Sequence, residues 1–388
     1  MRIPRRTAVI LIAASGVAAA LFILKINKDM VDFNVNYAAG DRLIHGETLY
    51  RTSDKHYQFK YAPFCAMIYA PLALLSPTAA RAIWYVLVLA ATAGSLCLTA
   101  RLLAPADEQG GRSARNAVLL AGLVLAKFFL REIQLGQINT IITFLLLLMV
   151  FNIVRDEAKR SSGRGAAAGF LWGLATAMKP YALIFLPYFI LRRRWNILWP
   201  ALLVLGLSLI APSAYYGFPG NLAVHMEWIS TLSRSTSILL DSQDNVSLLA
   251  MLTKWTHDPG FAQLGFAVFL LALVIVVYLF VRWSRGRPNA VVPETALLLL
   301  LIPLISPLGW DYTFLASVLA VALVLQHIQE LPKIVRFGLI LNLAVIGLSL
   351  YDLLGRRAYA AFMSASVLTL NFLIIVGVMV CLRWTRRI

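Results

Sequence analysis

Residues 261–281 read FAQLGFAVFLLALVIVVYLFV, and no charged side chain interrupts them. A second stretch, residues 358–382, is also free of charge. A helix of about 20 apolar residues crosses the ~30 Å hydrocarbon layer of a bilayer, so each stretch is long enough to span a membrane. Similar apolar runs recur along the whole 388-residue chain. The sequence therefore predicts an all-α, polytopic integral membrane protein.

The composition agrees with this fold class. Hydrophobic residues make up 60% of the chain and charged residues only 14%, whereas soluble domains carry about 25% charged residues. An ordinary cytosolic enzyme is thereby excluded. The cysteines (Cys65, Cys97 and Cys381) lie in or beside apolar segments without a CxxC pair. We expect them to be small apolar side chains, not a disulfide set or a metal site.

The net charge of +17 is concentrated in short segments that border apolar runs. Cytoplasmic loops of membrane proteins carry such an excess of Lys and Arg. The charge therefore predicts orientation in the membrane, not binding of nucleic acid. The segments are Arg2/Arg5/Arg6, Arg101/Arg112/Arg115, Arg155/Lys159/Arg160/Arg164, Arg192/Arg193/Arg194, Arg282/Arg285/Arg287, Lys333/Arg336 and Arg383/Arg386/Arg387.

Placing these segments inside the cell predicts one membrane domain, residues 1–388, with about twelve spans and both termini cytoplasmic. The protein is then expected in the cell (inner) membrane. Residues 62–75 are too short for a crossing and predict a re-entrant or juxtamembrane helix. Residues 28–60 and 214–259 form large outer loops, and residues 32–45 have the spacing of a helix lying on the membrane surface. The expected spans are about 7–27, 79–103, 116–131, 138–154, 165–179, 181–191, 196–213, 260–281, 290–306, 312–328, 335–352 and 363–382.

Under this topology the polar side chains gather at the outer face. Ionisable groups at membrane depth are costly and usually face a cavity, so their convergence indicates a site. Carboxylates, cations and amides on one side suit transfer chemistry on a lipid-borne substrate. A transported solute would need a site near the midplane.

The order of the polar motifs is similar to that of a known family. In chain order they are Val31-Asp32-Phe33-Asn34-Val35-Asn36-Tyr37, Phe59-Lys60-Tyr61-Ala62-Pro63, Leu135-Gly136-Gln137-Ile138-Asn139, Gly173 to Pro180 with Lys179, Asn245-Val246-Ser247-Leu248 and Ser306-Pro307-Leu308-Gly309-Trp310-Asp311. This succession, over about residues 28–315, resembles glycosyltransferase family 87. The resemblance implies a GT-C fold and an α-mannosyltransferase that uses a polyprenyl-phosphate sugar at the outer face.

The resemblance also implies that an aspartate in the first outer loop is the catalytic base, and Asp32 occupies that position. An inverting transfer needs one carboxylate to take the proton of the acceptor hydroxyl. The leaving lipid phosphate needs fixed cations, for which Lys179 is the first candidate, with Arg131 and Lys60. Asp32-Phe33-Asn34 lacks the second acid of a metal-binding DxD pair, so we expect no metal and no cofactor beyond the lipid-linked donor.

The remaining substrate-binding candidates are Tyr61, Gln137, Asn139, Asn245 and Asp311. The chain departs from the family pattern at Ala62, where proline is usual, at Val246, where glutamine is typical, and at Tyr312, where histidine is common. These positions fall on candidate sugar contacts. The expected partners are a polyprenyl-phosphate sugar, membrane lipids and a glycolipid or glycan acceptor. The sugar is expected to be mannose, with a pentofuranose as the alternative.

Simpler roles remain open for these residues. Asp32 is also suited to a helix N-cap, Lys179 to headgroup contact, and Lys60 and Tyr61 to interfacial anchoring. Arg131 and Glu132 have the alternative of pairing with each other. For the other candidates the alternatives are helix packing by Gln137 and Asn139, an aromatic-belt position for Trp310-Asp311, and a turn at Asp244-Asn245. A transporter or flippase for a lipid-linked sugar is the alternative of another class.

Overall fold

The computed structural model describes residues 15–104, 108–159, 162–284, 286–287 and 289–388. The chain is 84% helical, and no strand occurs among these residues. The predicted all-α class is confirmed. Only an isolated bridge between Asn245 and Trp310 has β geometry in the described part of the chain.

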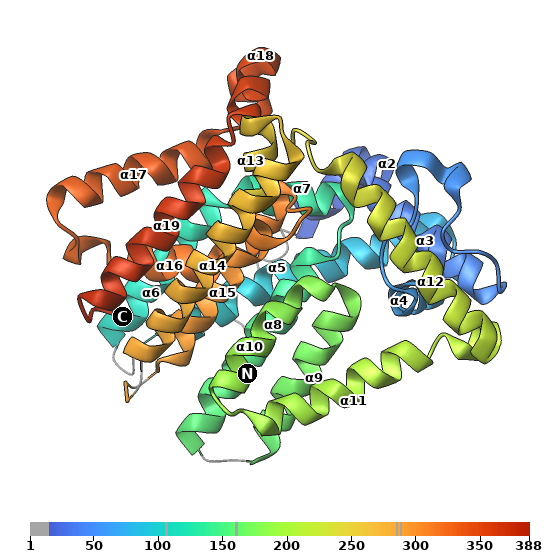
Figure 1. Ribbon diagram of the computed structural model, residues 1–388, viewed down its shortest axis with the longest axis horizontal. Helices are drawn as coiled ribbons and strands as arrows, with labels where there is room; N and C mark the ends of the chain where they lie inside the picture. Colours follow the sequence, from blue (N-terminus) through green and yellow to red (C-terminus); the bar gives the residue numbers. More distant parts are fainter. Residues whose placement is uncertain (1–14, 105–107, 160–161, 285, 288) are drawn as a thin grey trace.

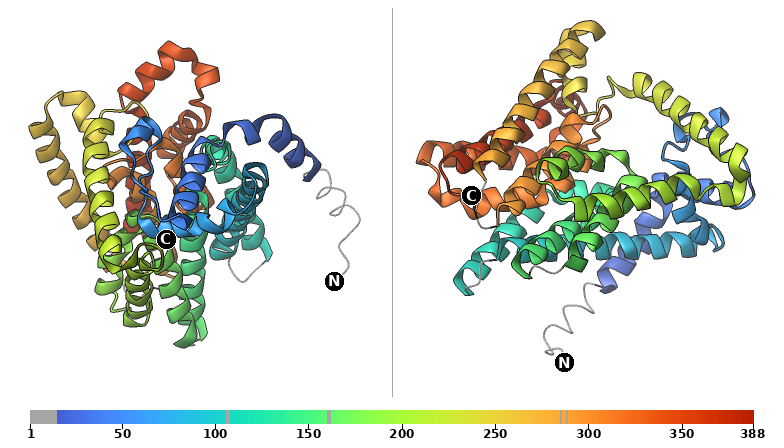
Figure 2. Two further views of the ribbon diagram at one scale, coloured as in Figure 1. Left: turned by 90° about the vertical axis from the view of Figure 1, so that its right-hand side faces the viewer. Right: turned by 60° about the horizontal axis from the view of Figure 1, so that its bottom comes forward.

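Among the described residues, four helices are long and apolar enough to cross a membrane, or up to six if each of two bent pairs is one span. The four are α5 (Pro77–Leu103), α8 (Asn139–Lys159), α14 (Pro259–Trp283) and α19 (Val367–Trp384). The bent pairs are α11 (Trp195–Ile210) with α12 (Ser213–Leu239), at 87°, and α17 (Lys333–Leu348) with α18 (Tyr351–Ser364), at 101°. Figures 1 and 2 show α12 turning across one end of the bundle instead of continuing α11. The count of about twelve spans stays a prediction.

Several other expected spans are shorter or interrupted. Segment 116–131 is divided at Leu125 between α6 (Glu108–Val124) and α7 (Ala126–Leu135). Helix α9 (Ser162–Met178) ends before Pro180, which begins the 3₁₀ turn η3 (Pro180–Ile184) and then α10 (Phe185–Leu191), because proline cannot continue a helix. The expected first span, 7–27, begins outside the described residues. Its described part runs as helix through the π-helical turn η1 (Phe22–Ile26) into α2 (Asn27–Asp29).

The core of the bundle is formed by α15 (Val291–Ile305), η4 (Asp311–Ser317) and α16 (Val318–Gln326), whose residues are almost all buried. Helices α8 and α19 pack on α15, α6 and α19 pack on α16, and α9 lies between α8 and α11. The runs 290–306 and 312–328 were expected as spans because they are apolar. Their burial shows that protein surrounds them on most sides, so their apolar side chains pack against other helices in the core.

Both large segments expected as outer loops are mostly helical. The first contains α3 (Val31–Ile44) and the turn η2 (Thr52–Tyr57), and α4 (Pro63–Ala73) follows. The second contains most of α12 and α13 (Leu248–Thr256). The helical spacing predicted for residues 32–45 is confirmed by α3.

Two ion pairs lie at the end of the bundle opposite the predicted site. Glu294, with a fully buried side chain, pairs with Arg192 and accepts a hydrogen bond from Tyr188, while Arg194 pairs with Glu157. These residues lie at the far ends of α8, α10 and α15 from Asn139, Lys179 and Asp311 respectively. The basic segment 192–194 and the predicted site therefore lie at opposite ends of the same group of helices.

Helix α3 lies against α4 with no room for a side chain at Gly40. A Cβ there would come within 2.7 Å of the Tyr69 backbone. The contact is reinforced by Asn36 Nδ2, which donates to Tyr69 Oη at 3.2 Å. Because α3 carries Asp32, this close approach helps to fix the position of the predicted base.

We expect Gly40→Ala to destabilise the protein by about 1–3 kcal/mol, because the added methyl group overpacks a rigid backbone contact. Thermal unfolding in detergent micelles measures the effect. Gly338→Ala is the matched control, because Gly338 is exposed on α17 with no atom within 4 Å of a new Cβ. Equal melting temperatures for the two variants would contradict the close-packing argument.

Candidate functional site

The turn between α7 and α8 brings Gln137 against Asp32. Gly136 ends α7 with a φ of +68°, a left-handed conformation that glycine adopts without strain. A Cβ on it would meet Phe33 Cβ at 2.6 Å, and its carbonyl accepts a hydrogen bond from Trp84 Nε1 at 2.8 Å. The turn is therefore packed directly against α3. Gln137 Nε2 donates to Asp32 Oδ2 at 2.7 Å.

Gln137 joins Asp32 to two tyrosines. Its Nε2 also lies 3.1 Å from Tyr312 Oη, and its Oε1 accepts a hydrogen bond from Tyr61 Oη at 3.0 Å. Asp32 lies in the first turn of α3, but Met30 is the N-cap and the cap has no side-chain hydrogen bond. The N-cap role considered for Asp32 is therefore wrong, and its carboxylate faces the other site residues.

Lys179 enters the same site from the end of α9. Its Nζ donates to Asn139 Oδ1 at 2.7 Å and lies 4.8 Å from the centre of the Tyr61 ring. Tyr181 Oη donates to the same Asn139 oxygen at 3.2 Å. Lys179 lies between the C-terminal end of α9 and the 3₁₀ turn that begins at Pro180. The interruption of the helix at this point therefore sets its position.

Asn139 connects Lys179 to a buried carboxylate. Its Nδ2 donates to Glu132 Oε1, and Glu132 Oε2 accepts from the Thr140 backbone N–H at 3.1 Å. Burial raises the pKa of Glu132 and lowers the pKa of Lys179, while the charge of each group favours the charged form of the other. Lys60 is half-buried, and burial lowers its pKa while the nearby Asp32 raises it. The site thus combines two lysines with two acidic residues in a place with little access to water. These residues are Lys60, Lys179, Asp32 and Glu132.

Arg131 belongs to a neighbouring cluster. Its Nη2 donates to Asp244 Oδ2 at 2.8 Å, its Nη1 lies 3.8 Å from Asp311 Oδ2, and its guanidinium lies 5.9 Å from the Tyr312 ring centre. The alternative that Arg131 pairs with Glu132 is therefore wrong. Asp311 Oδ1 is buried without a hydrogen-bond partner among the described residues.

Asn245 has structural contacts on both ends of its amide. Its Nδ2 donates to the carbonyls of Leu240 and Pro307, and its Oδ1 accepts from the backbone N–H groups of Ser247 and Gly309. These bonds tie the α12–α13 connection to the segment before Asp311. The turn-forming role considered for Asn245 agrees with this geometry.

The structure brings Asp32, Tyr61, Gln137, Asn139 and Lys179 into one hydrogen-bonded network. Arg131 and Asp311 border this network at Tyr312. Glu132, Tyr181 and Tyr312 also belong to this network, although no binding or catalytic role was predicted for them from the sequence. Two features of the sequence could have indicated these residues. Tyr181 lies two residues after Lys179, and Tyr312 occupies a position where histidine is common in the family.

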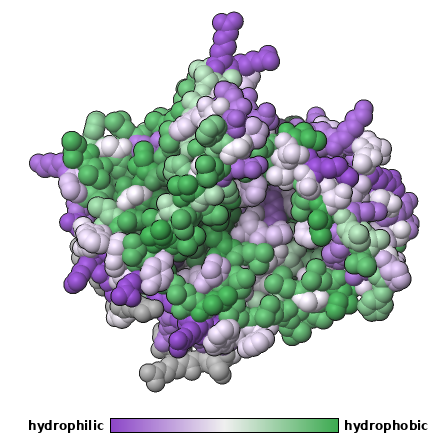
Figure 3. Space-filling view, viewed as in Figure 1, coloured by the Kyte–Doolittle hydropathy of each residue, from purple (hydrophilic) through white to green (hydrophobic). Residues whose placement is uncertain are grey.

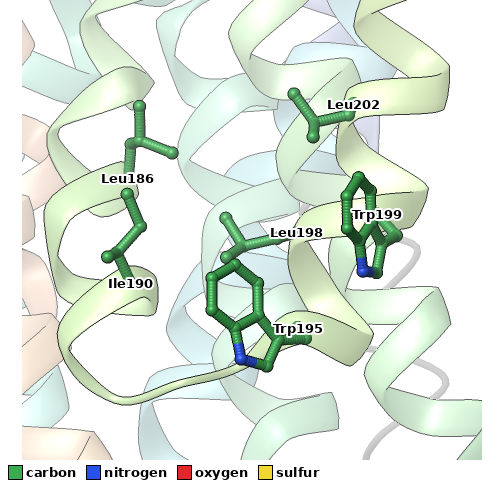
Figure 4. Close-up of a pocket in the computed structure, with 6 residues that line it drawn as sticks. All are labelled: Leu186, Ile190, Trp195, Leu198, Trp199 and Leu202. Atoms are coloured by element: carbon green, nitrogen blue, oxygen red, sulfur yellow. The ribbon is translucent and has the colours of Figure 1, made fainter.

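Apolar surface adjoins the site. Figure 3 shows a hollow with a hydrophilic floor, in the region where Figure 1 draws the upper ends of α8 and α9 below α12. Further along α10, Figure 4 shows Leu186 and Ile190 facing Trp195 and Leu198 of α11 across an apolar groove of about 170 Å³. The groove begins seven residues after Lys179, beyond the 3₁₀ turn η3.

No three His, Cys, Asp or Glu side chains among the described residues are grouped so as to hold a metal ion. The polar site is instead built from lysines, amides, tyrosines and carboxylates at one end of an apolar helical bundle. The fold and the site together define the class of protein: an integral membrane protein with a polar site next to apolar surface.

The sequence profile of glycosyltransferase family 87 matches residues 59–307, well over half of the chain. The protein therefore belongs to glycosyltransferase family 87 and is a membrane glycosyltransferase. The profile match begins after Asp32 and includes Lys60, Tyr61, Arg131, Gln137, Asn139, Lys179 and Asn245. The predicted family is confirmed.

One relative is the polyprenol-phosphate-mannose-dependent alpha-(1-2)-phosphatidylinositol pentamannoside mannosyltransferase of Mycolicibacterium smegmatis. The two chains are 28% identical over 174 residues, which cover 43% of this chain and 39% of the relative. The matched region thus spans less than half the length of that relative. No solved structure matches the chain.

We expect Asn139→Ala to destabilise the protein by about 1–3 kcal/mol, because Glu132 loses a donor and Lys179 loses an acceptor in a buried place. Thermal unfolding in detergent micelles reports the change. Asn152→Ala is the control, since Asn152 lies on the same helix and donates only to the Leu148 carbonyl one turn away. A loss no larger than that of the control would show that the Lys179–Asn139–Glu132 chain has little energetic weight.

Proposed function

We propose that this protein transfers a sugar, with mannose as the preferred one, from a polyprenyl phosphate to a hydroxyl group of a glycolipid or glycan at the outer face of the cell membrane. Family membership and the printed activity of the Mycolicibacterium relative support this substrate class. The observation that carries the proposal is the chain of contacts from Asp32 to Lys179: hydrogen bonds join Asp32 to Gln137 and Gln137 to Tyr61, and the Tyr61 ring centre lies 4.8 Å from the Lys179 ammonium. It places a carboxylate near a cation beside apolar surface, as a GT-C-type transfer from a lipid phosphate requires.

In the proposed reaction Asp32 takes the proton of the acceptor hydroxyl. The acceptor oxygen forms a bond to the anomeric carbon while the bond from that carbon to the phosphate oxygen breaks, and the leaving polyprenyl phosphate keeps the electron pair. Attack from the face opposite the leaving group inverts the anomeric centre. One carboxylate is sufficient for this step, so the proposal needs no metal and no further cofactor.

Lys179 stabilises the charge that develops on the phosphate. A fixed cation in a site with little water is worth more than the same cation in solution. Its hydrogen bond to Asn139 directs the ammonium, and a bound phosphate would favour the charged lysine against the effect of burial. Lys60 and Arg131 are proposed to add to this positive potential.

Gln137 positions the base by donating to Asp32 Oδ2, while the second oxygen of the carboxylate remains for the acceptor hydroxyl. Asn139, Tyr61 and the buried Oδ1 of Asp311 are proposed to contact the sugar. Asn245 is proposed to act indirectly, by holding the backbone that carries Asp311.

The polyprenyl chain is proposed to follow the apolar surface of α10 toward the groove shown in Figure 4. Lys179 lies at one end of the η3–α10 segment and the groove lies further along it. A phosphate held at Lys179 would thus have its hydrocarbon tail in contact with Leu186 and Ile190. The headgroup would remain at the polar site while the tail stays in the bilayer.

We expect Asp32→Asn to lower transfer by about 10²–10⁴-fold, the usual contribution of a general base, because asparagine cannot accept the proton. The assay measures sugar transfer from radiolabelled polyprenyl phosphate in nanodiscs, and donor binding is expected to persist. Asp41→Asn is the control on the same helix, where the carboxylate is exposed and beside His45 only. Full activity of Asp32→Asn would overturn the assignment, and movement of labelled donor without a new glycosidic bond would favour a flippase.

The proposed orientation predicts opposite labelling of two exposed positions. In a background with Cys65, Cys97 and Cys381 replaced by alanine, we expect Ser53→Cys to react with an impermeant maleimide from outside intact cells. Thr385→Cys should react only after the membrane is opened, because it lies beside the basic C-terminal segment. Labelling of both cysteines from outside would place the site and the basic end on the same face and contradict the topology.

A further inference from the structure

A second concave region lies on the other side of α3. It is a groove of about 500 Å³ between α3 and η2. Its lining includes Asn34, Val35, Ala38, Arg42, Asp54 and Tyr57. Pockets of about 300–1,000 Å³ enclose small organic ligands, so this groove has room for a short saccharide. The reaction described above does not use it.

The lining is both polar and apolar. Arg42 and Asp54 form a two-bonded ion pair whose side chains are only 15% and 21% exposed. Tyr57, which is 57% exposed, contributes an aromatic ring to the lining, and Val35 and Ala38 contribute small apolar side chains. Sugar rings have hydroxyl edges and C–H faces, and this combination offers contacts to both.

The groove lies near the predicted base, because its lining includes Val31, which directly precedes Asp32. In an α-helix successive residues are rotated by about 100°, so viewed along the axis of α3 Asp32 lies between Val35, about 60° to one side, and Asn36, about 40° to the other. Val35 lines the groove, whereas Asn36 is buried against Tyr69. Asp32 does not line the groove itself; it lies beside Val35 on the buried side of α3, where its carboxylate accepts a hydrogen bond from Gln137.

We propose that this groove binds the carbohydrate part of the acceptor and delivers its hydroxyl group to Asp32. The inference rests on the proposed function, which supplies the donor at Lys179. Inversion requires the acceptor and the leaving phosphate on opposite faces of the transferred sugar. The groove supplies the acceptor from one side of Asp32, and the network of Gln137, Tyr61 and Lys179 holds the donor on the other.

Filling the groove tests the proposal. We expect Ala38→Trp to raise the acceptor KM by about tenfold or more, because the indole occupies the space of a sugar ring. The donor KM and the slow hydrolysis of donor by water should stay unchanged. The acceptors are methyl α-mannobioside and octyl α-mannobioside, assayed in nanodiscs, and Ser53→Trp is the control on exposed η2 outside the groove.

Tyr57 provides a milder test that does not depend on overpacking. Tyr57→Ala should raise the acceptor KM by about 3- to 10-fold through loss of the ring face. Tyr57→Phe keeps the ring and should remain close to the unmodified protein. Binding of fluorescently labelled mannotriose to the inactive Asp32→Asn protein should weaken in the same order.

The outcomes separate the two proposals. An unchanged acceptor KM in Ala38→Trp and Tyr57→Ala, with transfer still dependent on Asp32, overturns the acceptor groove and leaves the proposed function intact. An effect on the octyl glycoside without one on the methyl glycoside assigns the groove to the lipid part and also overturns the inference. If the unmodified protein makes no glycosidic bond, the proposed function fails and the inference fails with it.

Discussion

The side-chain amide of Gln137 is the interaction on which the candidate site depends. It contacts Asp32 from α3, Tyr61 from the segment before α4, and Tyr312 from η4. These partners come from three regions of the chain, so one amide fixes their relative positions. Its own place is set by the left-handed turn at Gly136, which packs on Phe33 and receives the indole N–H of Trp84.

The same physical constraint explains the polar residues at both ends of the bundle. A charge in an apolar interior must be paired or hydrogen-bonded, because its desolvation is otherwise too costly. At one end of the bundle, the buried carboxylate of Glu294 forms an ion pair with Arg192. At the other, the ammonium of Lys179 contacts an amide oxygen and an aromatic ring, and the carboxylate of Glu132 contacts Asn139 and Thr140. The first arrangement is an ion pair between helices, whereas in the second the ammonium of Lys179 contacts uncharged groups of Asn139 and Tyr61.

The sequence was sufficient for the fold class, the family and much of the candidate site. An uncharged run as long as residues 261–281 can cross a bilayer, and within lipid it must be helical, because only internal hydrogen bonds satisfy the backbone there. The Lys179-Pro180 dipeptide indicated the break between α9 and η3, since proline blocks helix continuation. The order of the polar motifs identified the family and named Asp32 and Gln137, which the structure places in contact.

Tertiary structure alone decided which apolar runs are enclosed by protein and which polar residues meet. The run 290–306 is as hydrophobic as a membrane span, yet packing encloses it as α15, because hydropathy does not distinguish lipid from a protein core. Arg131 is adjacent to Glu132 in the sequence, but its guanidinium pairs with Asp244 and Asp311. Neighbouring residues on a helix point in different directions, so partners more than a hundred residues away determine what each side chain does.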